Sequence, residues 1–112
     1  PLTLSLLNEF ELGNALRFAG WRKLFPPGQI GRFLAAFETD RKSGRLVVMA
    51  CNLASVLTEA QRLSTTYTLA GGHWSFDILH VAAALESGAG EFLSFDANQR
   101  KLAQAEGLKL NP

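Results

Sequence analysis

Residues 76–106 read FDILHVAAALESGAGEFLSFDANQRKLAQAE, and this stretch decides the fold. It predicts a very apolar helix over Phe76–Ser87, a short strand over Phe92–Phe95 and a last helix over Ala97–Glu106. Gly107 stands where a left-handed residue commonly follows the end of a helix. A helix, a strand and a second helix in succession are typical of layered α/β folds, whose sheets are mostly parallel.

The same alternation continues on both sides of this stretch. Three further strands are expected, at Leu2–Ser5, Leu46–Ala50 and Leu108–Leu110. Three further helices are expected, at Leu6–Gly20, Gln29–Lys42 and, with Asn52 as its N-cap, as far as Thr66. We therefore predict one α/β domain over residues 1–112, in which ligands gather beyond the carboxyl ends of parallel strands.

The composition is that of an ordinary globular domain, with 47% hydrophobic and 19% charged residues. Eleven Lys and Arg balance ten Asp and Glu, so the whole-chain charge does not by itself indicate a nucleic-acid binder. Cys51 is the only cysteine, which excludes an intrachain disulfide and a cysteine zinc cluster and favours a reduced, cytoplasmic setting. No apolar run approaches the roughly 20 residues that span a bilayer, so we expect no membrane association.

Glu11 is the first of three acids in unusual places. It falls within an apolar stripe of the first helix, whereas Glu9 points to the other side of that helix. The stripe consists of Leu7, Ala15, Phe18 and Ala19. A carboxylate turned toward a core is costly unless it is paired, protonated or bound to a metal. The alternative is a salt-bridged glutamate at the edge of the stripe.

Asp77 and Asp96 each have an ordinary structural explanation. Asp77 opens the apolar helix, where the helix dipole favours an acid by roughly 0.3–1 kcal/mol. Asp96 reads as an N-cap, with Gln99 completing a capping-box-like pair. His80, one turn after Asp77, either orients a substrate or a carboxylate or is a satisfied core histidine. Together, the acids occupy positions near a ligand crevice, and such carboxylates suit Mg²⁺ or Mn²⁺, which can activate water and assist phosphoryl displacement.

Several motifs resemble those of PIN domains, especially bacterial toxins of the VapC type. The residues that carry the resemblance are DILHVAAAL at 77–85, GA at 88–89, FLSFD at 92–96, QR at 99–100, LA at 102–103, GL at 107–108 and SLLNEFEL at 5–12. The resemblance implies a three-layer α/β/α fold and a metal-dependent ribonuclease that hydrolyses RNA with Mg²⁺ or Mn²⁺. It also implies that Glu11, Asp77 and Asp96 are metal ligands and that Ser94 helps to orient Asp96 or a water. Arg100 is the best candidate for a phosphate contact, because it lies one turn beyond Asp96.

The resemblance lacks one part of the usual pattern. PIN domains usually open with a strand ending in an aspartate, and nothing in these residues supplies it. We therefore expect a fold truncated at its N-terminus, with three of the four usual acids and an unfilled slot in the sheet. Open strand edges invite pairing, so we expect a homo-dimer or higher oligomer, or further N-terminal residues. A VapC-like toxin would also imply an antitoxin protein as partner. The alternative function is a non-catalytic, truncated PIN-like interaction module.

Overall fold

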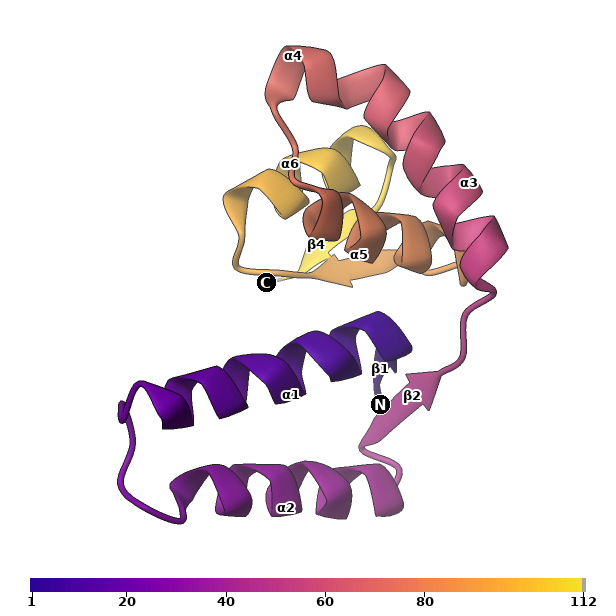
Figure 1. Ribbon diagram of the computed structural model, residues 1–112. Coiled ribbons are helices and arrows are strands. Elements are labelled where there is room, and N and C mark those ends of the chain that lie inside the picture. The colour runs from indigo at the N-terminus through magenta and orange to yellow at the C-terminus, as the bar shows by residue number, and fades with distance from the viewer. Residues whose placement is uncertain (112) are drawn as a thin grey trace. The chain divides into compact units, whose positions relative to one another are not determined.

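A computed structural model describes residues 1–111 of the chain (Figure 1). In chain order the elements are β1 (Leu2–Ser5), α1 (Leu6–Trp21), α2 (Gln29–Lys42), β2 (Leu46–Met49), α3 (Leu53–Leu63), the π-helix η1 (Ser64–Thr68), α4 (Leu69–Gly71), α5 (Ser75–Glu86), β3 (Glu91–Leu93), α6 (Ala97–Ala105) and β4 (Lys109–Asn111). These elements confirm the α/β class. They fall into two compact units, Pro1–Ala50 and Cys51–Pro112, which we call unit 1 and unit 2.

Unit 1 pairs a two-stranded parallel sheet with two helices. β1 runs parallel to β2, and α1 and α2 lie side by side in opposite directions (Figure 1). α1 begins at a capping box, in which Ser5 Oγ accepts from the Asn8 N–H at 3.1 Å and Asn8 Oδ1 accepts from the Ser5 N–H at 2.9 Å. The two helices approach closely at Gly20, where an added Cβ would lie 3.0 Å from Ile30 Cγ1. A larger residue at position 20 would therefore require the Ile30 side chain to shift by a few tenths of an ångström.

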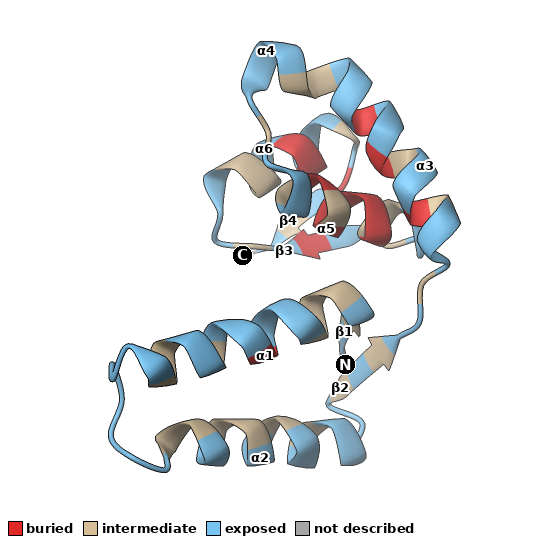
Figure 2. Cartoon of the chain, viewed as in Figure 1, coloured by how far each residue is buried: buried red, intermediate tan, exposed pale blue. Residues whose placement is uncertain are grey.

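Unit 1 has no buried apolar side chain within residues 1–50 (Figure 2). Gly13 is the one residue of this segment that is buried. Large apolar side chains are exposed instead, and Trp21 reaches 76% exposure. The others on α1 and the turn after it are Leu6, Phe10, Leu12, Phe18, Leu24 and Phe25. Large apolar side chains exposed in such number often mark a surface that packs against something else.

Unit 2 contains the hydrophobic core. α5 packs against both α3 and α6, and the fully buried side chains come from all three helices (Figure 2). The four largest are Val56, Leu63, Val81 and Leu102. Ala82 and Ala83 are also buried on α5, and such small residues allow neighbouring helices to approach. β3 pairs in parallel with β4, with Glu91 opposite Lys109. The core therefore fixes α5, which carries Asp77, and α6, which has Asp96 as its N-cap.

Both strand pairs are parallel, as the alternation of elements predicted, but they form separate two-stranded sheets among residues 1–111. The three-layer PIN-like arrangement stays a prediction. The third helix was expected to reach about Thr66, and the helical backbone does continue past that residue, although α3 ends at Leu63 and passes into the π-helix η1. The π-helix carries Tyr67, whose hydroxyl reaches Glu106 at 2.5 Å. Within the part of the chain that the structure describes, no helix is both long and apolar enough to cross a membrane.

Candidate functional site

Four of the six predicted site residues lie in unit 2 at the ends of its elements. Asp77 is in the first turn of α5 and is half-buried. Ser94 follows β3 directly, and Asp96 is the N-cap of α6. Arg100 is in the first part of α6 and is half-buried. The strand end and the two helix starts are therefore the elements that position this group.

Gln99, also in α6, joins three of these residues through hydrogen bonds. Its side-chain Nε2 donates to Asp77 Oδ1 at 2.8 Å, and its Oε1 accepts from Ser94 Oγ at 2.9 Å. Its backbone N–H donates to Asp96 Oδ1 at 2.9 Å. The Asp96 N–H in turn donates to Ser94 Oγ at 3.0 Å. Asp77 and Asp96, which come from different helices, are thus tied together through one residue.

The role of Gln99 differs from the one that the sequence suggested. In a capping box, its side chain would accept from the Asp96 N–H. That N–H donates to Ser94 instead, and the Gln99 amide is used by Ser94 and Asp77. The capping-box prediction was therefore wrong, although Asp96 is the N-cap as expected. The signal for Gln99 was present in the sequence as its spacing from Asp96, but a contact with Asp77 could not be seen from that spacing.

Arg100 brings a positive charge to the same turn. Its Nη1 donates to the backbone carbonyl of Ser94 at 3.0 Å. The guanidinium is therefore held beside the turn that leads from β3 to Asp96. A half-buried guanidinium in such a place can contact a phosphate, because Arg is suited to bind phosphate oxygens through several N–H groups.

His80 lies in the core of unit 2. It is 4% exposed, and its ring is tilted against that of Phe76, with 5.8 Å between the ring centroids. Its burial favours the core-histidine interpretation over direct contact with a substrate. A supporting role toward Asp77, one turn earlier on α5, stays a prediction.

Within unit 1, the two glutamates of α1 differ in burial from what the apolar stripe indicated. Glu11 is exposed, whereas Glu9 is half-buried and lies 3.4 Å from Arg41. α2 approaches α1 closely at Gly20, and Glu9 and Gly13 line the cavity between the two helices. The stripe that includes Glu11 is only partly covered in unit 1. Whether Glu11 is a metal ligand stays a prediction.

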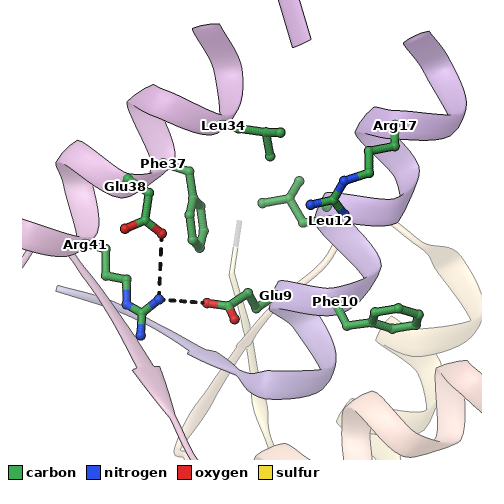
Figure 3. Close-up of a pocket in the computed structure, with 9 residues that line it drawn as sticks. Glu9, Phe10, Leu12, Arg17, Leu34, Phe37, Glu38 and Arg41 are labelled. Carbon is green, nitrogen blue, oxygen red and sulfur yellow. Dashed lines mark hydrogen bonds and ion pairs between the residues drawn. The ribbon is translucent and has the colours of Figure 1, made fainter. Parts of the chain in front are cut away.

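A cavity of about 410 Å³ lies between α1 and α2 (Figure 3). At one end, Arg41 Nη1 pairs with Glu9 at 3.4 Å and with Glu38 at 3.7 Å, as the dashed lines in Figure 3 show. The Arg17 guanidinium lies against Gly13, where an added Cβ would be 2.9 Å from Nη1. The apolar part of the wall consists of Phe10, Leu12, Leu34 and Phe37. This cavity combines apolar walls with charged ends and has no group of acids suited to a metal ion.

A second polar cluster clamps α3 and η1 to α6. Tyr67 Oη donates to Glu106 Oε2 at 2.5 Å, and Arg62 pairs with both Glu106 and Glu59. The hydrogen bonds from Arg62 and Tyr67 lower the pKa of Glu106 from its ordinary value. The hydrogen bond to Glu106 raises the pKa of Tyr67. We assign this cluster to stability, since its only carboxylates are already paired with Arg62.

Asp77 and Asp96 have the oxygen chemistry that Mg²⁺ and Mn²⁺ prefer. Each uses Oδ1 for a hydrogen bond with Gln99, and Oδ2 of each has no donor among residues 1–111. No three His, Cys, Asp or Glu side chains in that same range lie close enough together to hold a metal ion. Mg²⁺, however, is commonly bound through one or two carboxylates, with waters and substrate phosphates completing its coordination. Two carboxylates with one available oxygen each fit that pattern.

Comparison with known proteins adds no assignment, since no protein-family model matches the chain and no curated protein matches it.

Proposed function

We propose that the chain is a PIN-like ribonuclease domain that hydrolyses RNA phosphodiester bonds with Mg²⁺ or Mn²⁺. The observation that carries the proposal is the pair of acids in unit 2. Asp77 and Asp96 come from separate helices, are joined by hydrogen bonds to Gln99, and each keep one carboxylate oxygen without a protein donor in residues 1–111. Neither acid is paired with a cation of the protein among those residues, so both can serve as anionic ligands.

The residues divide the work of the proposed reaction. Asp77 and Asp96 would hold the divalent ion, and Glu11 is proposed as a third ligand. A bound ion of this kind supplies an activated water and stabilises the charge that develops on the phosphoryl group. Ser94 orients the turn before Asp96 through its hydrogen bonds with the Asp96 N–H and with Gln99. Arg100, held at the carbonyl of Ser94, would neutralise a phosphate of the RNA backbone.

The proposal extends to the fold of the chain and to the proteins that would bind it. We propose a three-layer PIN-like arrangement, acting in the cytoplasm as the toxin of a toxin–antitoxin pair. An antitoxin protein, or a second copy of the chain, would cover apolar surface of the early helices. The exposed aromatic side chains of α1, such as Phe10 and Trp21, support a covered face of this kind.

Cleavage of a labelled RNA tests the proposal directly. The wild-type chain should cut a fluorescent single-stranded RNA when Mn²⁺ or Mg²⁺ is added, and EDTA should stop the reaction. Asp77→Asn and Asp96→Asn should abolish cleavage. Asp40→Asn is the matched control. It removes the same charge from unit 1, where Asp40 pairs with Arg45, and Asp40 is not one of the proposed site residues. RNA that stays intact at high protein concentration, with either metal, would contradict the nuclease proposal.

A second candidate function is a non-catalytic interaction module. The observation that favours it is the absence of any buried apolar side chain in residues 1–50, together with the exposure of Trp21. Such a module would form a dimer or a complex without cutting RNA. Sedimentation measures this, and Phe10→Ser with Trp21→Ser should shift a dimer toward the monomer. A monomeric wild-type chain that cuts RNA would exclude the module.

A further inference from the structure

The sequence predicted only a capping role for Gln99, yet both the oxygen and the nitrogen of its side-chain amide form hydrogen bonds at the proposed site. Its Nε2 donates to Asp77, and its Oε1 accepts from Ser94. Its backbone N–H holds Asp96 independently. We infer that Gln99 is a positioning residue that sets the orientation of the Asp77 and Asp96 carboxylates for a divalent cation. The inference rests on the proposed function, and it adds a residue to that site.

The hydrogen bonds form a directed chain that permits only one orientation of the Gln99 amide. The Asp96 N–H donates to Ser94 Oγ, and the Ser94 hydroxyl donates to Gln99 Oε1. Gln99 Nε2 then donates to Asp77 Oδ1. If the amide were flipped, its oxygen would face the Asp77 carboxylate and its nitrogen would face the Ser94 hydroxyl. The first of these contacts would place two acceptors together, so the chain selects the observed orientation.

The chemistry of an amide suits this task better than that of a cationic side chain. An amide N–H fixes one carboxylate oxygen and leaves the negative charge in place. An arginine or lysine at the same position would pair with Asp77 and compete with a metal cation for its charge. Gln99 therefore orients Asp77 while it leaves Oδ2 and the full charge for a ligand. Hydrogen-bond partners of metal ligands commonly act in this way.

Gln99→Met is the variant that isolates this role. Methionine has a similar length and a good helix propensity, and the backbone N–H that caps Asp96 remains. The substitution removes only the bonds to Asp77 and Ser94. Gln104→Met is the matched control, because Gln104 is exposed on the same helix. Gln99→Asn is a second variant that stays polar but is too short to keep both bonds, and it covers the case in which Gln99→Met does not fold.

The measurement is Mn²⁺ binding by titration calorimetry, with thermal unfolding of each protein in EDTA. We expect Gln99→Met and Gln99→Asn to bind Mn²⁺ about 10–100-fold more weakly, the range found for such hydrogen-bond partners. Gln104→Met should bind like the wild type. In an Asp77→Asn background, Gln99→Met should have a much smaller effect, because its partner has lost the charge on which it acts.

Three different results would overturn the inference, and they can be told apart. If the wild type binds Mn²⁺ and both Gln99 variants bind it equally well, Gln99 has no positioning role while the proposed function stands. If the wild type does not bind Mn²⁺ at all, the proposed function fails and the inference fails with it. A loss of affinity that is matched by Gln104→Met would reflect the helix and would also count against a specific role of Gln99.

Discussion

Asp96 has two roles in this molecule that a pair of substitutions can separate. Its Oδ1 accepts from the Gln99 N–H and so caps α6, and its charge is proposed to bind a metal ion. Asparagine is as good an N-cap as aspartate but carries no charge, whereas alanine neither caps nor carries charge. Asp96→Asn therefore removes only the proposed catalytic property, and Asp96→Ala removes both.

The structure sets the expected size of each effect. Loss of the cap in Asp96→Ala should cost about 1 kcal/mol, which lowers the unfolding temperature of a small unit by about 4–8 °C. Asp96→Asn loses only the interaction of an exposed charge with the helix dipole, about 0.3 kcal/mol at the low end of the usual range. Both variants should lose at least about 100-fold in metal-dependent RNA cleavage, because even indirect partners of a metal ligand account for 10–100-fold.

Thermal unfolding followed by circular dichroism and cleavage of a fluorescent RNA measure the two properties on the same samples. Asp96→Asn and Asp96→Ala should differ in unfolding temperature and agree in the rate of RNA cleavage. If Asp96→Asn cut RNA as fast as the wild type, Asp96 would be a cap and nothing more. If Asp96→Asn were as unstable as Asp96→Ala, the assignment of the cap to the side-chain oxygen would be wrong.

Three further predictions test the core, the polar clamp and the third acid. Leu63→Ala should lower the free energy of unfolding in urea by about 2–5 kcal/mol, because Leu63 is fully buried in unit 2. A decrease of less than about 1 kcal/mol would contradict the assignment of Leu63 to the core. The pKa of Glu106 is lowered in the folded state, so its stabilisation is present above its ordinary value of 4.5 and is lost as the pH falls through the folded pKa. Tyr67→Phe should therefore unfold at a lower temperature than the wild type at pH 7. The difference should narrow as the pH falls below 4.5, and an unchanged difference would refute the coupling. Glu11→Gln should weaken Mn²⁺ binding by titration calorimetry, and unchanged binding would remove Glu11 from the proposed site.

Features set by neighbouring residues could be predicted from the sequence. The bounds of β1 and α2 agree with the prediction, and Asn52 caps α3 as expected, with its Oδ1 accepting from the Ser55 N–H. Gly107 follows α6 with a φ of 84°, the left-handed conformation that its position indicated. These features depend on caps, breakers and backbone preferences that act within a few residues.

Features set by packing between distant segments could not be predicted in the same way. The π-helix places Tyr67 against Glu106, a contact across 39 positions that no local pattern records. The apolar stripe of α1 indicated a different burial for its two glutamates, and α2 approaches α1 closely at Gly20. Asp77 and Asp96 could each be selected as candidates, but their connection through Gln99 required coordinates.

Both candidate functions require that the apolar surface of unit 1 be covered, but only the nuclease requires a metal site in unit 2. A segment of fifty residues without a buried apolar side chain lacks the burial that offsets the entropy of ordering its helices, so α1 needs a cover from outside residues 1–50 in either case. Covering of Trp21 or Phe10 therefore cannot distinguish a nuclease from an interaction module. The distinction depends on Asp77 and Asp96, because a nuclease needs both carboxylates to bind a cation, whereas an interaction module needs Asp96 only as the cap of α6. A metal ion bound through Asp77 and Asp96 is therefore the property that one candidate function requires and the other does not.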